Sequence, residues 1–227
     1  MSNLANRVDR LEEEVERLRK YIVIRDGLWV KEHLDKLDDF IISYDGVGDV
    51  DLLLQLDFDN LMMCRARVQE DFLEYCRRAA LQLEGLTDWA LRKEDDREPA
   101  SLGRKWKVVQ ENKERRWKPR SYDKDEYPKS IHRIRSMDAL ELTYCVFTEG
   151  QYHDIDREAR DRFNCLVKTL QMRNIASHRD ERSDPIRRMR DYERKFYKKR
   201  ESNYVAICSN IRKLKKTVLK YFDSRIS

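Results

Sequence analysis

Three side chains that could act on a phosphodiester lie within six residues of one another: Arg173, Asn174 and His178. A histidine can take up or release a proton near neutral pH. An arginine stays charged and can donate two hydrogen bonds to one phosphate. RNA supplies its own nucleophile in the 2′-hydroxyl, so such a set needs neither a metal ion nor a protein nucleophile. The segment therefore predicts a catalytic site for RNA cleavage, and no cofactor is expected.

A single straight helix would not bring the arginine and the histidine of this segment together. Residues five apart on a continuous helix point about 140° apart around its axis. Arg173 and His178 converge only if the helix ends or distorts between them, or if a second copy of the chain completes the site. Asn174 and Ser177 are residue types that can cap or bend a helix end. The sequence leaves both routes open.

The motif must be positioned by an amphipathic helix, which we expect to begin at Asp154 or Asp156. The apolar residues that would face inward recur at helical spacing: Ile155, Ala159, Phe163, Leu166, Val167 and Leu170. A preceding helix is expected from Ser130 or Asp138 to about Thr148. Both helices would bury one face against the rest of the domain.

A long basic helix is expected to follow the motif. Asp184–Pro185 predicts its start, because Asp caps helices and Pro fits their first turn, and a break is expected near Ser202–Asn203. From Ile186 to Ser227 the chain has 14 Lys and Arg against 4 Asp and Glu, although its net charge is only +5. This segment predicts binding to a polyanion such as nucleic acid.

Two further helices are expected upstream, over roughly residues 28–44 and from Asp57 or Asp59 to near Leu91. The second carries the longest apolar rhythm of the chain, and Gly85 would bend it. Charged residues make up 40% of the 227 residues, with only 6 Gly and 4 Pro. Together these features predict an all-α bundle of four to five main helices.

The first 24 residues have the spacing of a coiled coil. Apolar residues alternate at intervals of four and three: Leu4, Val8, Leu11, Val15, Leu18 and Ile22. β-Branched residues at one core position with Leu at the other favour a parallel two-stranded coil. Residues 1–24 are therefore predicted to help a homodimer form; the alternative is a helix that folds back on its own domain.

Residues 94–129 are unusually charged, with 20 charged side chains in 36 positions and three prolines, Pro99, Pro119 and Pro128. We expect an extended insertion here, because proline interrupts helices. Its cations alternate with aromatic residues that could stack on unpaired bases. The RNA-binding candidates of this insertion are Arg104, Lys105, Trp106, Arg115, Arg116 and Trp117. The alternative, equally open, is a solvated loop whose tryptophans fold back on the core.

The pattern Arg173-Asn174, three further residues and His178 resembles the signature of the HEPN superfamily of nucleotide-binding helical domains. The resemblance covers about residues 57–227, which leaves 1–24 as a dimerisation helix and 25–56 as a connector. It implies a metal-independent endoribonuclease whose two motifs face one another across a homodimer. It also implies a toxin–antitoxin or antiviral setting, with an antitoxin or another defence protein as a partner.

Some of these residues can also be explained by a purely structural role. Arg173 and His178 could simply satisfy a helix C-terminus, where cations are favourable. Glu84 could reach across to orient Arg173, although solvation on a helix surface is the favoured reading. Four arginines beside the motif complete the RNA-binding candidates: Arg179, Arg182, Arg187 and Arg188. The competing functions are a non-catalytic RNA- or nucleotide-binding module and a coiled-coil scaffold in a defence complex.

The remaining composition points to a cytoplasmic protein with no membrane span. No run of about 18 apolar residues is present. The five cysteines lie in apolar helical contexts, which favours reduced core residues over disulfides: Cys64, Cys76, Cys145, Cys165 and Cys208. No Cys or His pair has the spacing of zinc ligands, so no structural metal is expected.

Overall fold

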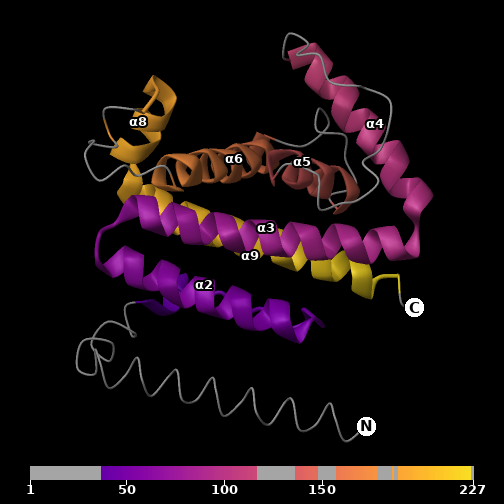
Figure 1. Ribbon diagram of the computed structural model, residues 1–227, viewed down its shortest axis with the longest axis horizontal. Helices are drawn as coiled ribbons and strands as arrows, with labels where there is room; N and C mark the ends of the chain where they lie inside the picture. Colours follow the sequence, from indigo (N-terminus) through magenta and orange to yellow (C-terminus); the bar gives the residue numbers. More distant parts are fainter. Residues whose placement is uncertain (1–36, 117–135, 148–156, 178–185, 187–188, 226–227) are drawn as a thin grey trace, which may run out of the picture. The chain divides into compact units, whose positions relative to one another are not determined.

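The computed structural model describes residues 37–116, 136–147, 157–177, 186 and 189–225 (Figure 1). These residues form seven α-helices and no strand, which confirms the predicted all-α bundle. The chain divides into two units, Met1–Phe40 and Ile41–Ser227. In the first unit the described residues hold the short 3-10 helix η1 (Asp38–Phe40), and the predicted coiled coil over 1–24 lies outside them. All seven α-helices belong to the second unit.

Helix α3 (Phe72–Arg97) is the central element of the second unit. The helices packed against it are α2 (Val50–Val68), α4 (Pro99–Arg116), α5 (Ser136–Phe147), α6 (Arg157–Ser177) and α9 (Arg200–Asp223). In Figure 1, α2 lies on one side of α3, α5 and α6 lie on the other, and α9 passes behind it. The remaining helix, α8 (Asp191–Lys198), contacts α6 and α9. Because neighbours surround α3, its buried residues are not confined to one narrow stripe.

The predicted helix from Asp57 or Asp59 to Leu91 is wrong: two helices occupy this region and its flanks. Helix α2 begins earlier, where Asp49 Oδ1 accepts the Leu52 N–H at 3.0 Å. The chain then turns after Val68, with Glu70 in the left-handed region at φ 55°. Asp71 caps α3 by accepting the Glu74 N–H at 3.0 Å. Periodicity missed the break because both helices bury residues in the same core.

Helix α3 continues through Gly85 to Arg97 without a break. A Cβ atom at Gly85 would lie 2.9 Å from Leu52 Cδ1 on α2. The glycine therefore allows α2 and α3 to approach closely, which is a packing role that a single sequence does not distinguish from a bend.

Residues 41–44 are not helical, so the predicted helix over 28–44 is wrong at its end. The segment is fixed by side chains of α2 and α3: Ile42 N–H donates to Asn60 Oδ1 at 2.9 Å, and the Tyr44 hydroxyl donates to Gln82 Oε1 at 2.6 Å. These long-range hydrogen bonds outweigh the local helical pattern. A turn follows at Asp45–Gly46.

Cations of α9 hold the same segment from its other side. Arg212 Nη2 donates to the Ile41 carbonyl oxygen and Lys215 Nζ donates to the Ser43 carbonyl oxygen, each at 2.7 Å. Two of the basic residues counted in the C-terminal segment thus have a structural role. They satisfy backbone carbonyls that lack a helical or strand partner.

The extended insertion predicted over 94–129 is wrong where the structure describes it. Helix α3 runs on to Arg97, and residues 99–116 form α4. Pro99 is the first residue of α4, a position where the missing N–H costs little. Leu102, Trp106 and Val109 recur at helical spacing and are all buried. Pro99 therefore separates two helices as the first residue of the second one, and the segment is not extended.

The last helices follow the prediction more closely. Helix α6 carries Arg173 and Asn174 in its last described turns, and its expected capping residues lie outside the described part. The basic helix predicted to run on from Asp184–Pro185 is wrong at residues 189–190, which are not helical, and α8 begins at Asp191. The break before α9 falls at Lys199, close to the predicted position. None of the five cysteines, all of which are described, forms a disulfide, and four of them are buried. Among the described residues, none of the helices combines the length and the apolar character that crossing a bilayer requires.

Candidate functional site

Arg173 is held by an ion pair that spans two helices. Its Nη1 atom, in the last turns of α6, lies 2.7 Å from Oε1 and 2.8 Å from Oε2 of Glu84 on α3. The neighbouring Met172 is buried, which fixes the rotation of α6 at this point. The favoured reading of Glu84 as a solvated surface residue is therefore wrong, because its carboxylate reaches Arg173.

Ser136 completes this contact from a third helix. Its hydroxyl, at the start of α5, donates to Glu84 Oε1 through a short hydrogen bond. One carboxylate thus joins α3, α5 and α6. Sequence reasoning missed Ser136, and no local pattern could have found it, because 52 positions separate it from Glu84.

The ion pair leaves Arg173 accessible. About 28% of its side chain and 25% of that of Glu84 remain exposed. A guanidinium has five N–H donors, and the contact with Glu84 uses those of Nη1. Donors of the same planar group can therefore meet an incoming anion while the carboxylate fixes the plane. The same carboxylate also compensates part of the positive charge.

The remaining motif residues are placed unequally. Asn174 is exposed on α6, one residue after the ion pair. Helix α6 is described as far as Ser177, so His178 and the nearby Arg179, Arg182, Arg187 and Arg188 lie outside the described residues. The convergence of Arg173 and His178 stays a prediction.

A cleft of about 420 Å³ opens beside Glu84, between α2 and α3. Its charged lining consists of Asp49, Asp51, Glu84, Asp88 and Arg92. Asp49 caps α2, and Asp88 Oδ2 pairs with Arg92 Nη2 at 3.0 Å. Four carboxylates against one guanidinium make this cleft unfavourable for phosphate. An RNA strand would have to reach Arg173 from outside the cleft.

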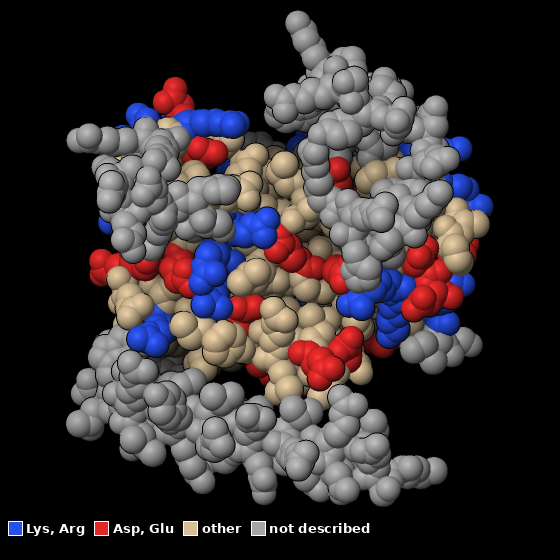
Figure 2. Space-filling model, viewed as in Figure 1, with Lys and Arg blue, Asp and Glu red and all other residues tan. Residues whose placement is uncertain are grey.

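The described residues show no arrangement of three or more His, Cys, Asp or Glu side chains that could hold a metal ion. On the face shown in Figure 2, acidic and basic side chains lie next to one another, without an extended patch of one sign. Attraction of a polyanion to the described part of this face would therefore be weak.

The candidate RNA-binding residues of the insertion divide into different environments. Trp106 is 9% exposed and packs inside, which favours the reading in which this tryptophan folds back on the core. Arg104 is exposed and lies 3.4 Å from Glu98, while Lys105 is partly buried. The side chains of Arg115, Arg116 and Trp117 lie outside the description.

No family model matches this chain. No curated protein and no solved structure matches it either. The resemblance to the HEPN superfamily therefore depends on the Arg173–His178 sequence pattern, in a chain whose described residues are all-α.

Proposed function

We propose that this chain is a metal-independent endoribonuclease that cleaves single-stranded RNA at a site formed by two copies of the chain. The observation that carries the proposal is the oriented, accessible guanidinium of Arg173, beside exposed Asn174 and five residues before His178. The setting would be cytoplasmic, in a toxin–antitoxin or antiviral system.

Each motif residue has a defined step in this scheme. His178 acts as general base at the 2′-hydroxyl or as general acid at the leaving 5′-oxygen. Arg173 stabilises the charge that develops on the scissile phosphate, and Asn174 positions the pair through hydrogen bonds. Attack of the 2′-oxygen on phosphorus breaks the bond to the 5′-oxygen. The products are a 2′,3′-cyclic phosphate and a 5′-hydroxyl end.

The Glu84 contact supports a catalytic role for Arg173. An arginine side chain has several free rotations, and their loss on binding opposes transition-state stabilisation. An ion pair that already fixes the guanidinium reduces this cost before RNA arrives. In a composite site, the heptads of residues 1–24 would keep the two copies together.

The test is cleavage of a labelled single-stranded RNA in EDTA, with the 2′,3′-cyclic phosphate identified by mass spectrometry. His178→Ala and Arg173→Ala should each abolish cleavage while the oligomeric state is unchanged. Arg67→Ala is the matched control, because Arg67 is equally exposed (27%) and pairs with Glu201 at 3.1 Å away from the motif. Cleavage that disappears with chelator, or persists in His178→Ala, would refute the proposed chemistry.

A second candidate is a non-catalytic RNA-binding module. It is favoured by the same ion pair, since Glu84 compensates the charge of Arg173 and could give it a purely structural role. This candidate predicts salt-sensitive RNA binding without turnover, and equal affinity for RNA in His178→Ala and in the unmodified chain.

A further inference from the structure

Helix α9 contains the longest acid-free basic stretch of the described C-terminal segment. Between Glu201 and Asp223 the sequence has five Lys or Arg and no Asp or Glu. The five cations are Arg212, Lys213, Lys215, Lys216 and Lys220. The acidic residues of α9 lie at its two ends, Glu201 and Asp223, with Asp223 three residues after Lys220. The field of the five cations therefore depends mainly on what the rest of the fold places beside them.

The fold uses part of this charge. Arg212 and Lys215 donate to the carbonyl oxygens of residues 41 and 43, as described above. Lys213 Nζ lies 3.4 Å from Glu158 Oε1 on α6, in a pair that is more than half exposed. Lys215 is thus directed towards the 41–45 segment, and Lys213 towards α6.

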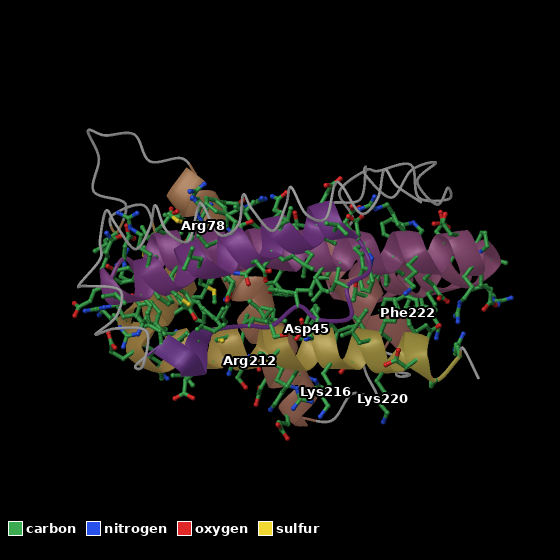
Figure 3. All side chains as sticks on the ribbon, turned by 90° about the horizontal axis from the view of Figure 1, so that it is seen from below. Asp45, Arg78, Arg212, Lys216, Lys220 and Phe222 are labelled. Carbon is green, nitrogen blue, oxygen red and sulfur yellow. The ribbon has the colours of Figure 1, made fainter. Side chains whose placement is uncertain are left out.

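Lys216 and Lys220 differ from these. Both side chains are exposed, and neither forms a salt bridge or a hydrogen bond with any side chain that the structure describes. With Arg212 they are spaced four residues apart, so they share one face of α9, with a step of about 6 Å along the axis. We call Arg212, Lys216 and Lys220 the basic stripe. Figure 3 shows it along one side of α9, with Lys216 and Lys220 directed away from the bundle.

The opposite face of α9 explains why the stripe stays in place. Ile211, Leu214 and Val218 are buried in the core, as is Phe222. The helix therefore cannot rotate to hide its cations without exposing these residues. The guanidinium of Arg212 is further fixed by its hydrogen bond to the Ile41 carbonyl oxygen.

We infer that the basic stripe binds the sugar–phosphate backbone of single-stranded RNA, away from the cleavage motif. The inference rests on the proposed function for the identity of the polyanion. A row of cations on a rigid helix suits a polymer with one charge per repeat. The acidic cleft beside Glu84 repels the same polymer, so the stripe would supply an attraction that the described residues lining this cleft do not.

An anionic membrane surface fits this face less well. Peripheral helices combine cations with large apolar side chains that enter the lipid. Along the stripe, between Arg212 and Lys220, the non-basic residues are a buried leucine and valine, a threonine and a partly buried leucine. The exposed large apolar residue of α9 is Val205, about two turns before the stripe.

The experiment measures binding of the full chain to a fluorescent 20-nucleotide polyuridine, by anisotropy, between 50 and 200 mM NaCl. The variant is the double substitution Lys216→Gln/Lys220→Gln. Lys195→Gln/Lys198→Gln on α8 is the control, because it removes the same charge from two exposed lysines of another helix. Lys216→Arg/Lys220→Arg keeps the charge and should keep the affinity.

The stripe variant should bind RNA about tenfold more weakly, and its salt slope should fall by about 1.4, since each single-strand phosphate contact contributes about 0.7. The control variant should change the RNA affinity and the salt slope less than the stripe variant does. Equal losses in both double variants would overturn the inference, because net charge alone would then explain binding. A stripe variant that binds RNA normally but loses binding to phosphatidylserine vesicles or to polyglutamate would also overturn it.

Cleavage assays on the same variants separate the two proposals. The stripe variant should show a raised KM with an unchanged kcat, because it leaves the motif intact. A chain that binds RNA through the stripe but never cuts would support the inference and refute the ribonuclease. If the protein cuts RNA with the same KM in the stripe and control variants, the result would support the ribonuclease and refute RNA binding by the basic stripe.

Discussion

The contact between Glu84 and Arg173 makes a quantitative prediction about the candidate site. Glu84→Gln keeps the shape of the side chain and its hydrogen-bonding oxygen but removes the negative charge that orients the guanidinium. If this orientation serves catalysis, the substitution should reduce cleavage more than it reduces stability. A double-mutant cycle with Arg173→Met, which keeps the aliphatic stem, isolates the energy of the pair.

The distances and exposure set the size of the effect. Two unit charges about 4 Å apart attract one another by about 4 kcal/mol at an effective dielectric constant of 20. About a quarter of each side chain is exposed, and measured exposed pairs contribute only about 0.2–1 kcal/mol after screening and side-chain ordering. We therefore expect the Glu84–Arg173 pair to contribute about 1 kcal/mol to the free energy of unfolding, so that its loss lowers the Tm by about 2–4 °C.

Cleavage should respond more strongly. In Glu84→Gln the guanidinium must be ordered at each turnover. The kcat/KM of this variant should therefore fall about tenfold, which is equivalent to about 1.4 kcal/mol of transition-state stabilisation. The assay combines thermal unfolding with initial rates on a fluorogenic single-stranded RNA. Raising NaCl to 1 M should reduce the stability coupling, because ions screen a partly exposed pair.

Glu74→Gln is the matched control for this experiment. Glu74 lies on the same helix, has an exposed fraction similar to that of Glu84, and pairs with Arg77 at 2.7 Å and Arg78 at 2.8 Å. Glu74→Gln should lower the free energy of unfolding at least as much as Glu84→Gln does, and it should leave kcat/KM unchanged. An equal loss of kcat/KM in both variants, or zero coupling between Glu84 and Arg173, would contradict an orienting role for Glu84.

Three further predictions concern stability and reactivity. Gly103→Ala should raise the free energy of unfolding by up to about 1 kcal/mol in thermal melts, because Ala favours the helical backbone over Gly and the added Cβ meets no other part of the fold within 4 Å. Gly85→Ala should gain less, because its Cβ would lie 2.9 Å from Leu52 Cδ1, and the reverse order would contradict the close α2–α3 contact. Burial raises the pKa of Glu74, but the hydrogen bonds and charges of Arg77 and Arg78 together outweigh this and lower it below its ordinary value. The stabilisation by Glu74 is therefore present at neutral pH and lost as the pH falls through the folded pKa, so the destabilisation by Glu74→Gln in denaturant titrations should be largest near pH 7 and should shrink at acid pH. Partly buried Cys165 should react first with Ellman's reagent, whereas burial raises the pKa of Cys64 to about 12 and should delay its reaction until unfolding; a fast Cys64, identified by peptide mapping, would contradict its buried position.

The all-α fold and the helix that carries the motif could be predicted because they depend on local patterns. Apolar spacing along residues 157–177 describes a helix with one buried face, and the structure contains it. The same reasoning failed at residues 69–71. There, the pattern continues through a turn, and the cap that separates the helices is a single aspartate among many acidic residues.

The contacts of the candidate site could not be read from the sequence for a different reason. Glu84 meets Arg173 across 89 positions and Ser136 across 52. Such contacts depend on the packing of α3 against α5 and α6, which no periodicity specifies. Proline in the charged insertion led us to predict an extended segment where the structure has a helix. Pro99 begins α4, at a position where proline is tolerated.

The central position of α3 has a consequence for synthesis on the ribosome. The buried residues of α3 can pack against α6 and α9 only after those helices have been synthesised. About 125 residues separate the end of α3 from the end of α9. At about 5–20 residues per second, α3 would remain incompletely covered for about 6–25 s after its own synthesis. During that interval the nascent chain offers an apolar helix surface to chaperones, or to a second nascent copy emerging nearby.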